Sequence, residues 1–296
     1  MNGPVYDTDF PDPDVVALEG GKDYLAFATN GNGRNVQVVG SADLQTWEQL
    51  DDALPVLPGW TTEGKVWAPE VIELADGRWA MYYTTMAPDP AIQCIGVAFA
   101  DEPAGPYRDT RSGPLVCETK TGGSIDAHPF RAADGALYLF WKNDGNAVGV
   151  DTWISGQRLA ADGVTLQGSP KQLFRQDLPW EGELVEAPFL WEHDGKFFMF
   201  YSANSYASAD YAVGYAVADQ PLGTYTKNPE PILVSDDAAA GPGHCSLFTD
   251  EQGQVWMAYH AWPGDAPGDD AFGRAMWLSK VSFDGAGLPV VVPPAG

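Results

Sequence analysis

The sequence has 296 residues, and its 41 acidic against 16 basic residues give a formal net charge of −25. This balance leaves no basic patch to neutralise phosphates, which argues against nucleic-acid binding and against attraction to an anionic membrane surface. The longest apolar runs are as long as a strand, far short of the roughly 20 residues of a membrane-spanning helix. The 33 Gly and 24 Pro, together with 11 Trp, 12 Tyr and 13 Phe, predict an all-β fold with many turns.

A glycine turn followed by an aromatic-rich strand recurs five times along the chain. The turns are 56, 58, 60 and 58 residues apart and begin at Gly21, Gly77, Gly135, Gly195 and Gly253. A repeat made of short strands is typical of a propeller blade. Because five such units account for the whole chain, we expect residues 1–296 to form one domain. The predicted fold is a five-bladed β-propeller with four antiparallel strands in each blade.

The predicted strands are rich in β-branched and aromatic residues and are separated by Gly, Asp and Pro. The first unit has strands at 15–18, 24–29, 35–41 and around Trp47. The aromatic strands of the second and third units lie at 78–85 and 136–143. The fourth unit has strands at 187–193, 197–203, 211–218 and near Tyr225, and the aromatic strand of the fifth unit lies at 254–262. Helical periodicity of useful length is absent from the sequence.

The first strand of each unit opens with a residue type that can carry chemistry. In chain order these residues are Asp12, Trp67, Asp126, Glu186 and His244. With Pro69 taken as the equivalent position of the second unit, the repeats are 57, 57, 60 and 58 residues apart. Because the innermost strands of a propeller surround a central channel, we expect these side chains to converge on one pocket.

Carboxylates that share a largely apolar pocket have their pKa values pushed apart by burial and mutual repulsion. Glycoside hydrolysis uses such a separation, because one carboxyl must donate a proton while another stays ionised. Asp12, Asp126 and Glu186 therefore indicate a glycosidase. Asp14 lies two residues beyond Asp12 and could share its strand face, whereas we expect Glu70 to be mainly structural.

These motifs resemble those of glycoside hydrolase family 43, from Phe10-Pro-Asp-Pro-Asp-Val to Arg274. The resemblance implies a five-bladed catalytic propeller that hydrolyses with inversion. It implies that Asp12 is the general base and Glu186 the general acid. It further implies that Asp126 orients the acid and keeps it protonated.

The resemblance also implies roles for residues around these acids. His244, in a Gly-Pro-Gly-His motif, is expected near the channel centre and beside a bound cation such as calcium. Arg274 is expected to contact sugar or acids, and Phe10 is placed with the substrate-binding residues. Trp67 offers a flat aromatic face to sugar C–H groups. His260 is also a candidate for substrate binding, although core packing explains it equally well.

We therefore expect an exo-acting α-L-arabinofuranosidase on arabinan or arabinoxylan that works as a monomer and requires no cofactor. A β-xylosidase, a non-catalytic sugar-binding propeller, cleavage of galactofuranose and endo action stay open. The first residues, Met1-Asn2-Gly3-Pro4, lack the features of a signal peptide, so the protein is either cytoplasmic or exported after removal of its signal. Cys94 and Cys117 can pair in an exported protein, which leaves Cys245 unpaired.

Overall fold

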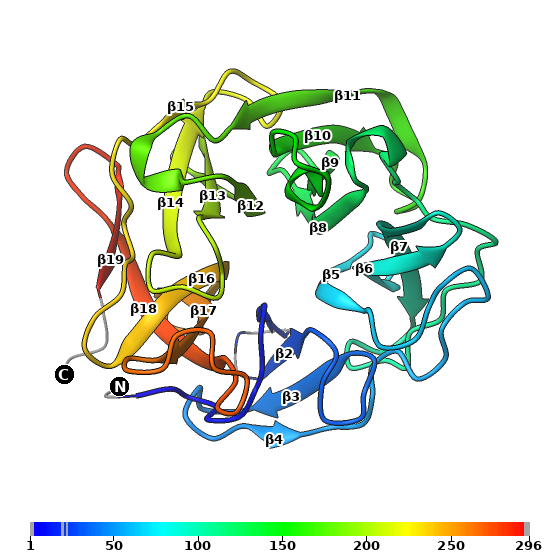
Figure 1. The fold of residues 1–296 in the computed structure, drawn as a ribbon, viewed down its shortest axis with the longest axis horizontal. Coiled ribbons are helices and arrows are strands. Elements are labelled where there is room, and N and C mark those ends of the chain that lie inside the picture. Colours follow the sequence, from blue (N-terminus) through cyan, green and yellow to red (C-terminus); the bar gives the residue numbers. More distant parts are fainter. Residues whose placement is uncertain (1–2, 19–20, 22, 293–296) are drawn as a thin grey trace.

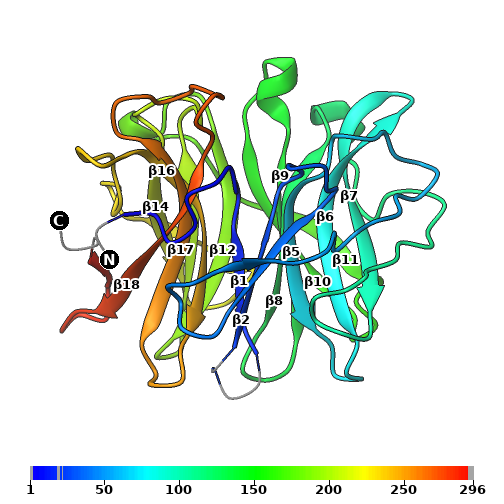
Figure 2. The same cartoon turned by 90° about the horizontal axis from the view of Figure 1, so that it is seen from below.

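Five antiparallel sheets stand in a ring in the computed structural model of the protein, which describes residues 3–18, 21 and 23–292 (Figure 1). Within each sheet the strands are hydrogen-bonded in the order in which they occur along the chain, so each blade is a meander. Seen from the side, the blades surround the axis of the ring, and hairpin turns gather at one end of it (Figure 2). The predicted five-bladed β-propeller is confirmed.

The strands follow the five units of the sequence. Blade one contains β1 (Asp14–Ala17), β2 (Tyr24–Ala28), β3 (Gln37–Ser41) and β4 (Glu48–Gln49). Blade two contains β5 (Trp67–Glu73), β6 (Trp79–Pro88) and β7 (Ala91–Ala100), and blade three contains β8 (Ser124–Arg131), β9 (Leu137–Asn143), β10 (Trp153–Leu159) and β11 (Leu166–Arg175). Blade four contains β12 (Val185–His193), β13 (Lys196–Ala203), β14 (Ala212–Ala218) and β15 (Thr226–Lys227). Blade five contains β16 (Ala239–Thr249), β17 (Val255–Pro263), β18 (Ala275–Phe283) and β19 (Pro289–Val292), and the 3₁₀ helices are η2 (Thr119–Thr121), η3 (Gly145–Val148) and η4 (Pro179–Glu181).

Blade two differs from the predicted pattern, because its sheet has three regular strands. The outer position is occupied by an irregular segment that pairs with β7 only through the bridges Phe99–Arg108 and Ile95–Val116. Pro106 and Pro114 lie in or beside this segment, and proline has no N–H to give to a strand ladder. A disulfide between Cys94 and Cys117 ties the segment to β7, the pairing that the sequence left open.

Apolar packing between neighbouring blades holds the ring together. The buried apolar side chains form five clusters, one at each interface between blades. In the cluster between blades one and two, for example, Phe27 and Tyr83 are both fully buried. The ring is closed near the N-terminus, where Val5 N–H donates to the carbonyl of Met276 in β18 at 2.8 Å. The first and last blades are therefore joined by backbone pairing.

The unpaired cysteine and the helix content say little about function. Cys245 is buried and unpaired, as expected. Among residues 3–18, 21 and 23–292, no helix is long and apolar enough to cross a membrane.

Candidate active site

Each blade has one non-glycine residue at a positive φ angle, between 43° and 60°, either just before its innermost strand or within it. These residues are Asp12, Ala68, Asp126, Ala187 and His244. Positive φ is uncommon outside glycine and is often found at functional sites. In β5, β8, β12 and β16 the strand pairing shifts at the same place, as in a β-bulge. A bulge changes the direction of side chains relative to the regular alternation, and three of these five residues, Asp12, Asp126 and His244, line the cavity described below.

This register corrects the alignment of the repeats that the sequence suggested. Glu186 pairs with Ser202, whereas the residue equivalent to Asp12 in that blade is Ala187. In blade two the equivalent residue is Ala68 and not Pro69. Counting residues between repeats was therefore wrong by one position in these two blades, because the number of residues from one positive-φ residue to the next varies.

A cavity of about 410 Å³ lies where the innermost strands begin, within the size range of small-molecule sites. Six of the eight predicted site residues line it: Asp12, Trp67, Asp126, Glu186, His244 and Arg274. They come from all five blades and from chain positions more than 200 residues apart. The predicted convergence on one pocket is therefore found in the structure.

Phe10 and His260 do not line this cavity. Phe10 is fully buried, packs edge-on against Tyr6 and belongs to the core between blades five and one, which corrects its predicted place in the substrate site. His260 is also fully buried and lies behind Asp12, whose backbone N–H donates to His260 Nδ1 at 3.1 Å. Burial lowers the pKa of His260 to about 4, so the ring is neutral at neutral pH. His260 thus supports Asp12 from the core side of the strand.

Asp12 is surrounded by donors and positive charge. Its Oδ1 is 3.1 Å from Arg274 Nη1 and 3.3 Å from His244 Nδ1, and its Oδ2 accepts a hydrogen bond from Thr29 Oγ1. Burial by itself would raise the pKa of Asp12, but Arg274, His244 and His260 together lower it well below its ordinary value. Asp12 is therefore ionised at neutral pH, as a general base must be.

Asp126 has the opposite character. Its backbone N–H donates to Thr84 Oγ1 at 3.1 Å, and its Oδ2 accepts from the backbone N–H of Ala187 at 3.0 Å. Burial and the nearby Glu186 carboxylate raise the pKa of Asp126 to about 6, although His244 and Lys142 oppose the rise. The cavity thus contains two aspartates whose pKa values lie on opposite sides of the ordinary value.

Glu186 is held by two residues that were not predicted from the sequence. Tyr211 OH donates to Oε1 at 2.8 Å, and Lys142 Nζ donates to Oε2 at 3.1 Å. Lys142 Nζ also lies 3.7 Å from Asp144 Oδ1. Lys142 was detectable in principle, since it is a charged residue in the aromatic strand of the third repeat. Tyr211 gave no such signal, because it directly precedes β14 and reaches the site only through the fold.

Asp14 and Glu70 lie deeper in the channel and do not line the cavity. Asp14 Oδ2 accepts from the backbone N–H of Val71 at 2.8 Å, and Glu70 Oε2 is 2.6 Å from His128 Nδ1. Burial raises the pKa of both acids well above the ordinary values. The contact with His128 agrees with the structural role predicted for Glu70.

His244 lines the cavity, but its surroundings do not fit a directly bound metal ion. Burial would lower its pKa, yet the carboxylates of Asp12, Asp126 and Glu186 outweigh burial and raise it. Within residues 3–18, 21 and 23–292, no group of three or more His, Cys, Asp or Glu side chains is arranged to hold a metal. The calcium expected beside His244 stays a prediction, which metal analysis of the purified protein would test.

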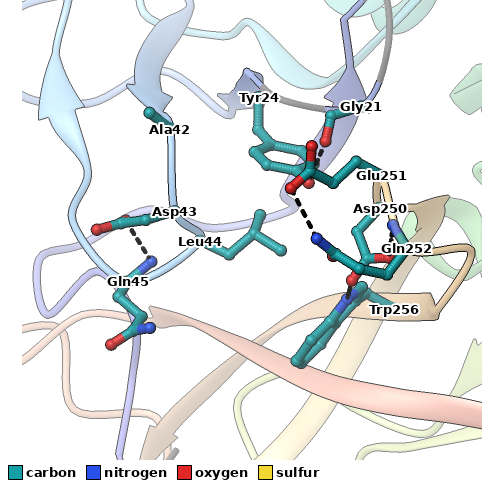
Figure 3. Close-up of a pocket in the computed structure, with 10 residues that line it drawn as sticks. All are labelled: Gly21, Tyr24, Ala42, Asp43, Leu44, Gln45, Asp250, Glu251, Gln252 and Trp256. Atoms are coloured by element: carbon teal, nitrogen blue, oxygen red, sulfur yellow. Dashed lines mark hydrogen bonds between the residues drawn. The ribbon is translucent and has the colours of Figure 1, made fainter.

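A second cavity, of about 580 Å³, lies at the opposite end of the innermost strands, between blades one and five (Figure 3). Its polar side chains bond mainly to one another: Trp256 Nε1 donates to Asp250 Oδ2 at 2.8 Å, and Gln252 Nε2 donates to Glu251 Oε1 at 2.7 Å. Among the described residues that line it, lysine, arginine and histidine are absent. Its described lining therefore has acids but none of the acid–cation pairs that distinguish the first cavity.

Comparison with known proteins gives a consistent result over almost the whole chain. A family model described as Glycosyl hydrolases family 43 matches residues 1–289. The chain is 27% identical over 269 residues to the β-D-galactofuranosidase xynD of Aspergillus niger, a match that covers 86% of this chain and 74% of that protein. Among solved structures, a thermostable family-43 glycoside hydrolase has a TM-score of 0.87 and 32% identity, covering 97% of this chain and 93% of the other.

Two further relatives carry names of arabinan-degrading enzymes. The chain is 29% identical over 245 residues to an extracellular endo-α-(1->5)-L-arabinanase of Thermotoga petrophila, which covers 72% of this chain. It is 26% identical over 242 residues to an extracellular exo-α-(1->5)-L-arabinofuranosidase of Streptomyces avermitilis, which covers 76% of this chain. The chain spans 50% and 49% of the length of these two relatives.

Proposed function

Since the chain belongs to glycosyl hydrolases family 43, and is thus a glycoside hydrolase with a carbohydrate substrate, we propose that it removes terminal α-L-arabinofuranose from arabinan or arabinoxylan with inversion. The observation that supports the mechanism is the opposite pKa shift of the two aspartates in one cavity. The pKa of Asp12 is lowered well below its ordinary value, whereas that of Asp126 is raised to about 6. One face of the cavity therefore favours an ionised carboxylate and the other favours a proton.

In the proposed reaction, Asp12 accepts a proton from water as the water attacks the anomeric carbon of the sugar. Glu186 gives its proton to the glycosidic oxygen, and the bond between that oxygen and the anomeric carbon breaks. The products are a free sugar with inverted configuration and a chain shortened by one residue. Asp12 then releases a proton, and Glu186 regains one, so the enzyme returns to its starting state.

The other residues of the cavity have supporting roles in this proposal. Asp126 holds the backbone N–H of the residue that follows Glu186, which fixes the direction of the acid. Trp67 is half-buried in the cavity wall and offers an aromatic surface to the sugar ring. Tyr206, 49% exposed at the cavity, stacks over Arg274 with 4.7 Å from the guanidinium carbon to the ring centre. Both aromatic faces suit a carbohydrate ligand.

The choice of sugar and of exo action is supported by the relative named as an exo-α-(1->5)-L-arabinofuranosidase. A β-D-galactofuranosidase is the second candidate, because the relative with that name matches a larger share of both chains.

We also propose that the protein acts as a monomer in an oxidising compartment. The disulfide between Cys94 and Cys117 supports the compartment, since such bonds persist mainly outside the cytosol.

Hydrolysis of a panel of nitrophenyl glycosides tests the choice of sugar directly. We expect α-L-arabinofuranoside to be cleaved with the highest kcat/KM, and linear arabino-oligosaccharides to release arabinose one unit at a time. Preference for β-D-galactofuranoside or β-D-xyloside would replace the sugar in the proposal, and early release of long fragments would replace exo by endo action. Binding of arabino-oligosaccharides without any hydrolysis would refute the enzymatic proposal as a whole.

A further inference from the structure

The backbone N–H groups of the five positive-φ residues need hydrogen-bond acceptors, because they lie at the buried edge of the channel. Four of them find an acceptor on the second strand, or just after it, of the preceding blade. Thr29 accepts from Ala68, Thr84 from Asp126, Ser202 from His244, and His260 from Asp12, at 2.8–3.1 Å. These four acceptors occupy equivalent positions, since Thr84, Ser202 and His260 each pair with the residue just before the positive-φ residue of their own blade.

Blade three has Lys142 at this position, paired in register with Ile125. A lysine ammonium is only a donor, so it cannot accept a hydrogen bond from Ala187 N–H in blade four. Asp126 Oδ2 accepts it instead, at 3.0 Å. In this blade, therefore, the acceptor of the N–H group is Asp126 and not the residue of the second strand. This hydrogen bond ties the Asp126 carboxylate to the backbone next to Glu186.

Lys142 also brings a charge that no equivalent residue carries. Its side chain is 1% exposed, and its Nζ lies 3.1 Å from Glu186 Oε2. The carboxylates that line the cavity are Asp12, Asp126, Asp144 and Glu186. Arg274 forms an ion pair with Asp12. Of the lysine and arginine residues that line the cavity, Lys142 is the one that lies beside the other acids. Without it, Asp126, Asp144 and Glu186 would share that side of the cavity, with His244 as the positive group near Asp126 and Glu186.

We propose that Lys142 is a positioning residue that fixes the Asp126–Glu186 pair and weakens its hold on the catalytic proton. The inference rests on the proposed function, since it concerns the proton that Glu186 gives to the leaving group. A donor that held its proton too tightly would transfer it slowly, so a nearby cation tunes the acid toward its task. Lys142 opposes the rise in the pKa of Asp126 and lies within hydrogen-bond distance of Glu186, so its charge acts on both carboxylates.

Charged or titratable groups face the pair from the strands and segments packed around it. These groups are Asp12, Glu70, Lys142, Asp144, Tyr211 and His244. Lys142→Met removes only the ammonium from this set and keeps an unbranched apolar side chain of similar length. Lys142→Arg keeps the charge and the donors. The comparison between them separates charge from packing.

The test is the pH dependence of kcat/KM, measured on the best substrate of the glycoside panel. In Lys142→Met we expect the alkaline limb to move upward by about one to three pH units, because a positive charge within hydrogen-bond distance is lost. In Lys142→Arg we expect the limb to stay within a few tenths of a unit of the wild type. An alkaline limb of Lys142→Met that coincides with the wild type would overturn the proposal. Should the Met variant fail to fold by circular dichroism, Lys142→Gln supplies the same loss of charge with a donor retained.

Ser202→Ala is the matched control, because it alters the equivalent position of blade four without changing charge. We expect its alkaline limb to remain in place even if its stability falls. A shift as large as that of Lys142→Met would mean that any damage to these positions moves the limb, and it would overturn the charge argument.

A second readout separates this inference from the proposed function. Carbon-13 NMR of labelled Asp and Glu carboxyls follows the proton of the pair without turnover. We expect the midpoint to rise in Lys142→Met by the same amount as the kinetic limb. If Glu186→Gln showed that Glu186 is not the acid, while the carboxyl midpoint still rose, the proposed function would fail and the electrostatic role of Lys142 would stand. An unmoved midpoint would refute the role of Lys142 and leave the proposed function intact.

Discussion

Replacing Asp126 by asparagine should make the protein more stable at neutral pH while removing most of its activity. Asparagine has the shape of the protonated acid, and its side-chain oxygen can still accept from Ala187 N–H, now 3.0 Å from Asp126 Oδ2. The substitution therefore keeps the hydrogen bond that orders the start of β12. It removes the charge whose burial and repulsion by Glu186 raise the pKa of Asp126 to about 6.

The size of the effect follows from linkage. The folded-state pKa of about 6 lies above the unfolded value of about 3.9, so the folded protein binds the extra proton between these pH values. The free energy of unfolding therefore falls as pH rises from about 4 to about 6. At about 1.36 kcal/mol per unit, ionisation of Asp126 costs about 3 kcal/mol at pH 7. The Asp126→Asn variant avoids this cost, which corresponds to a rise in Tm of roughly 5 °C for a chain of this length.

Chemical denaturation at pH 4 and at pH 7 measures this difference. We expect Asp126→Asn to exceed the wild type at pH 7 and to match it near pH 4, where the wild-type acid is protonated. Asp76→Asn is a suitable control, because Asp76 is exposed and its pKa is lowered by the neighbouring Arg78. A gain of equal size at both pH values, or a loss of stability at pH 7, would contradict the reasoning.

Three further predictions concern the reaction. Glu186→Gln should lose about 10²- to 10⁴-fold in kcat/KM on natural glycosides but far less on a dinitrophenyl glycoside, whose leaving group needs no proton; equal losses would count against the acid role. Arg274→Met should move the acidic limb of kcat/KM upward by about one to three pH units, because Arg274 helps to lower the pKa of Asp12. An acidic limb that stays in place would exclude Asp12 as the titrating base. Proton NMR of the first sugar released should show inverted anomeric configuration; retention would remove Asp12 from the role of base.

Much of the fold was predictable because a propeller blade is a local structure. Glycine turns and aromatic strands recur within each unit, so five units could be identified without knowledge of long-range contacts. The fourth strand of blade two was not predictable in this way. Its segment contains Pro106 and Pro114, which leave isolated bridges where a regular ladder was expected.

The site was predictable where it depends on the repeat and not where it depends on side-chain direction. Asp12, Asp126 and His244 occupy equivalent positions and indeed line one cavity. Phe10 stands two residues before Asp12, and nothing in the motif revealed that its ring enters the core. Lys142 belongs to a second strand, so its contact with Glu186 becomes visible only when two blades are placed side by side.

The junction between blades three and four explains why the acid pair lies there and not elsewhere in the ring. A non-glycine residue at positive φ costs on the order of 1–3 kcal/mol, and such residues persist only where the surrounding structure fixes them. At four junctions the N–H of that residue is satisfied by Thr, Ser or neutral His. At the fifth junction Lys142 cannot accept this hydrogen bond, and Asp126 accepts it. One carboxylate therefore both completes the backbone hydrogen bonding and faces the cavity. The fold itself therefore holds Asp126 and the residue after Glu186 together, and a proton donor needs such order before the reaction begins.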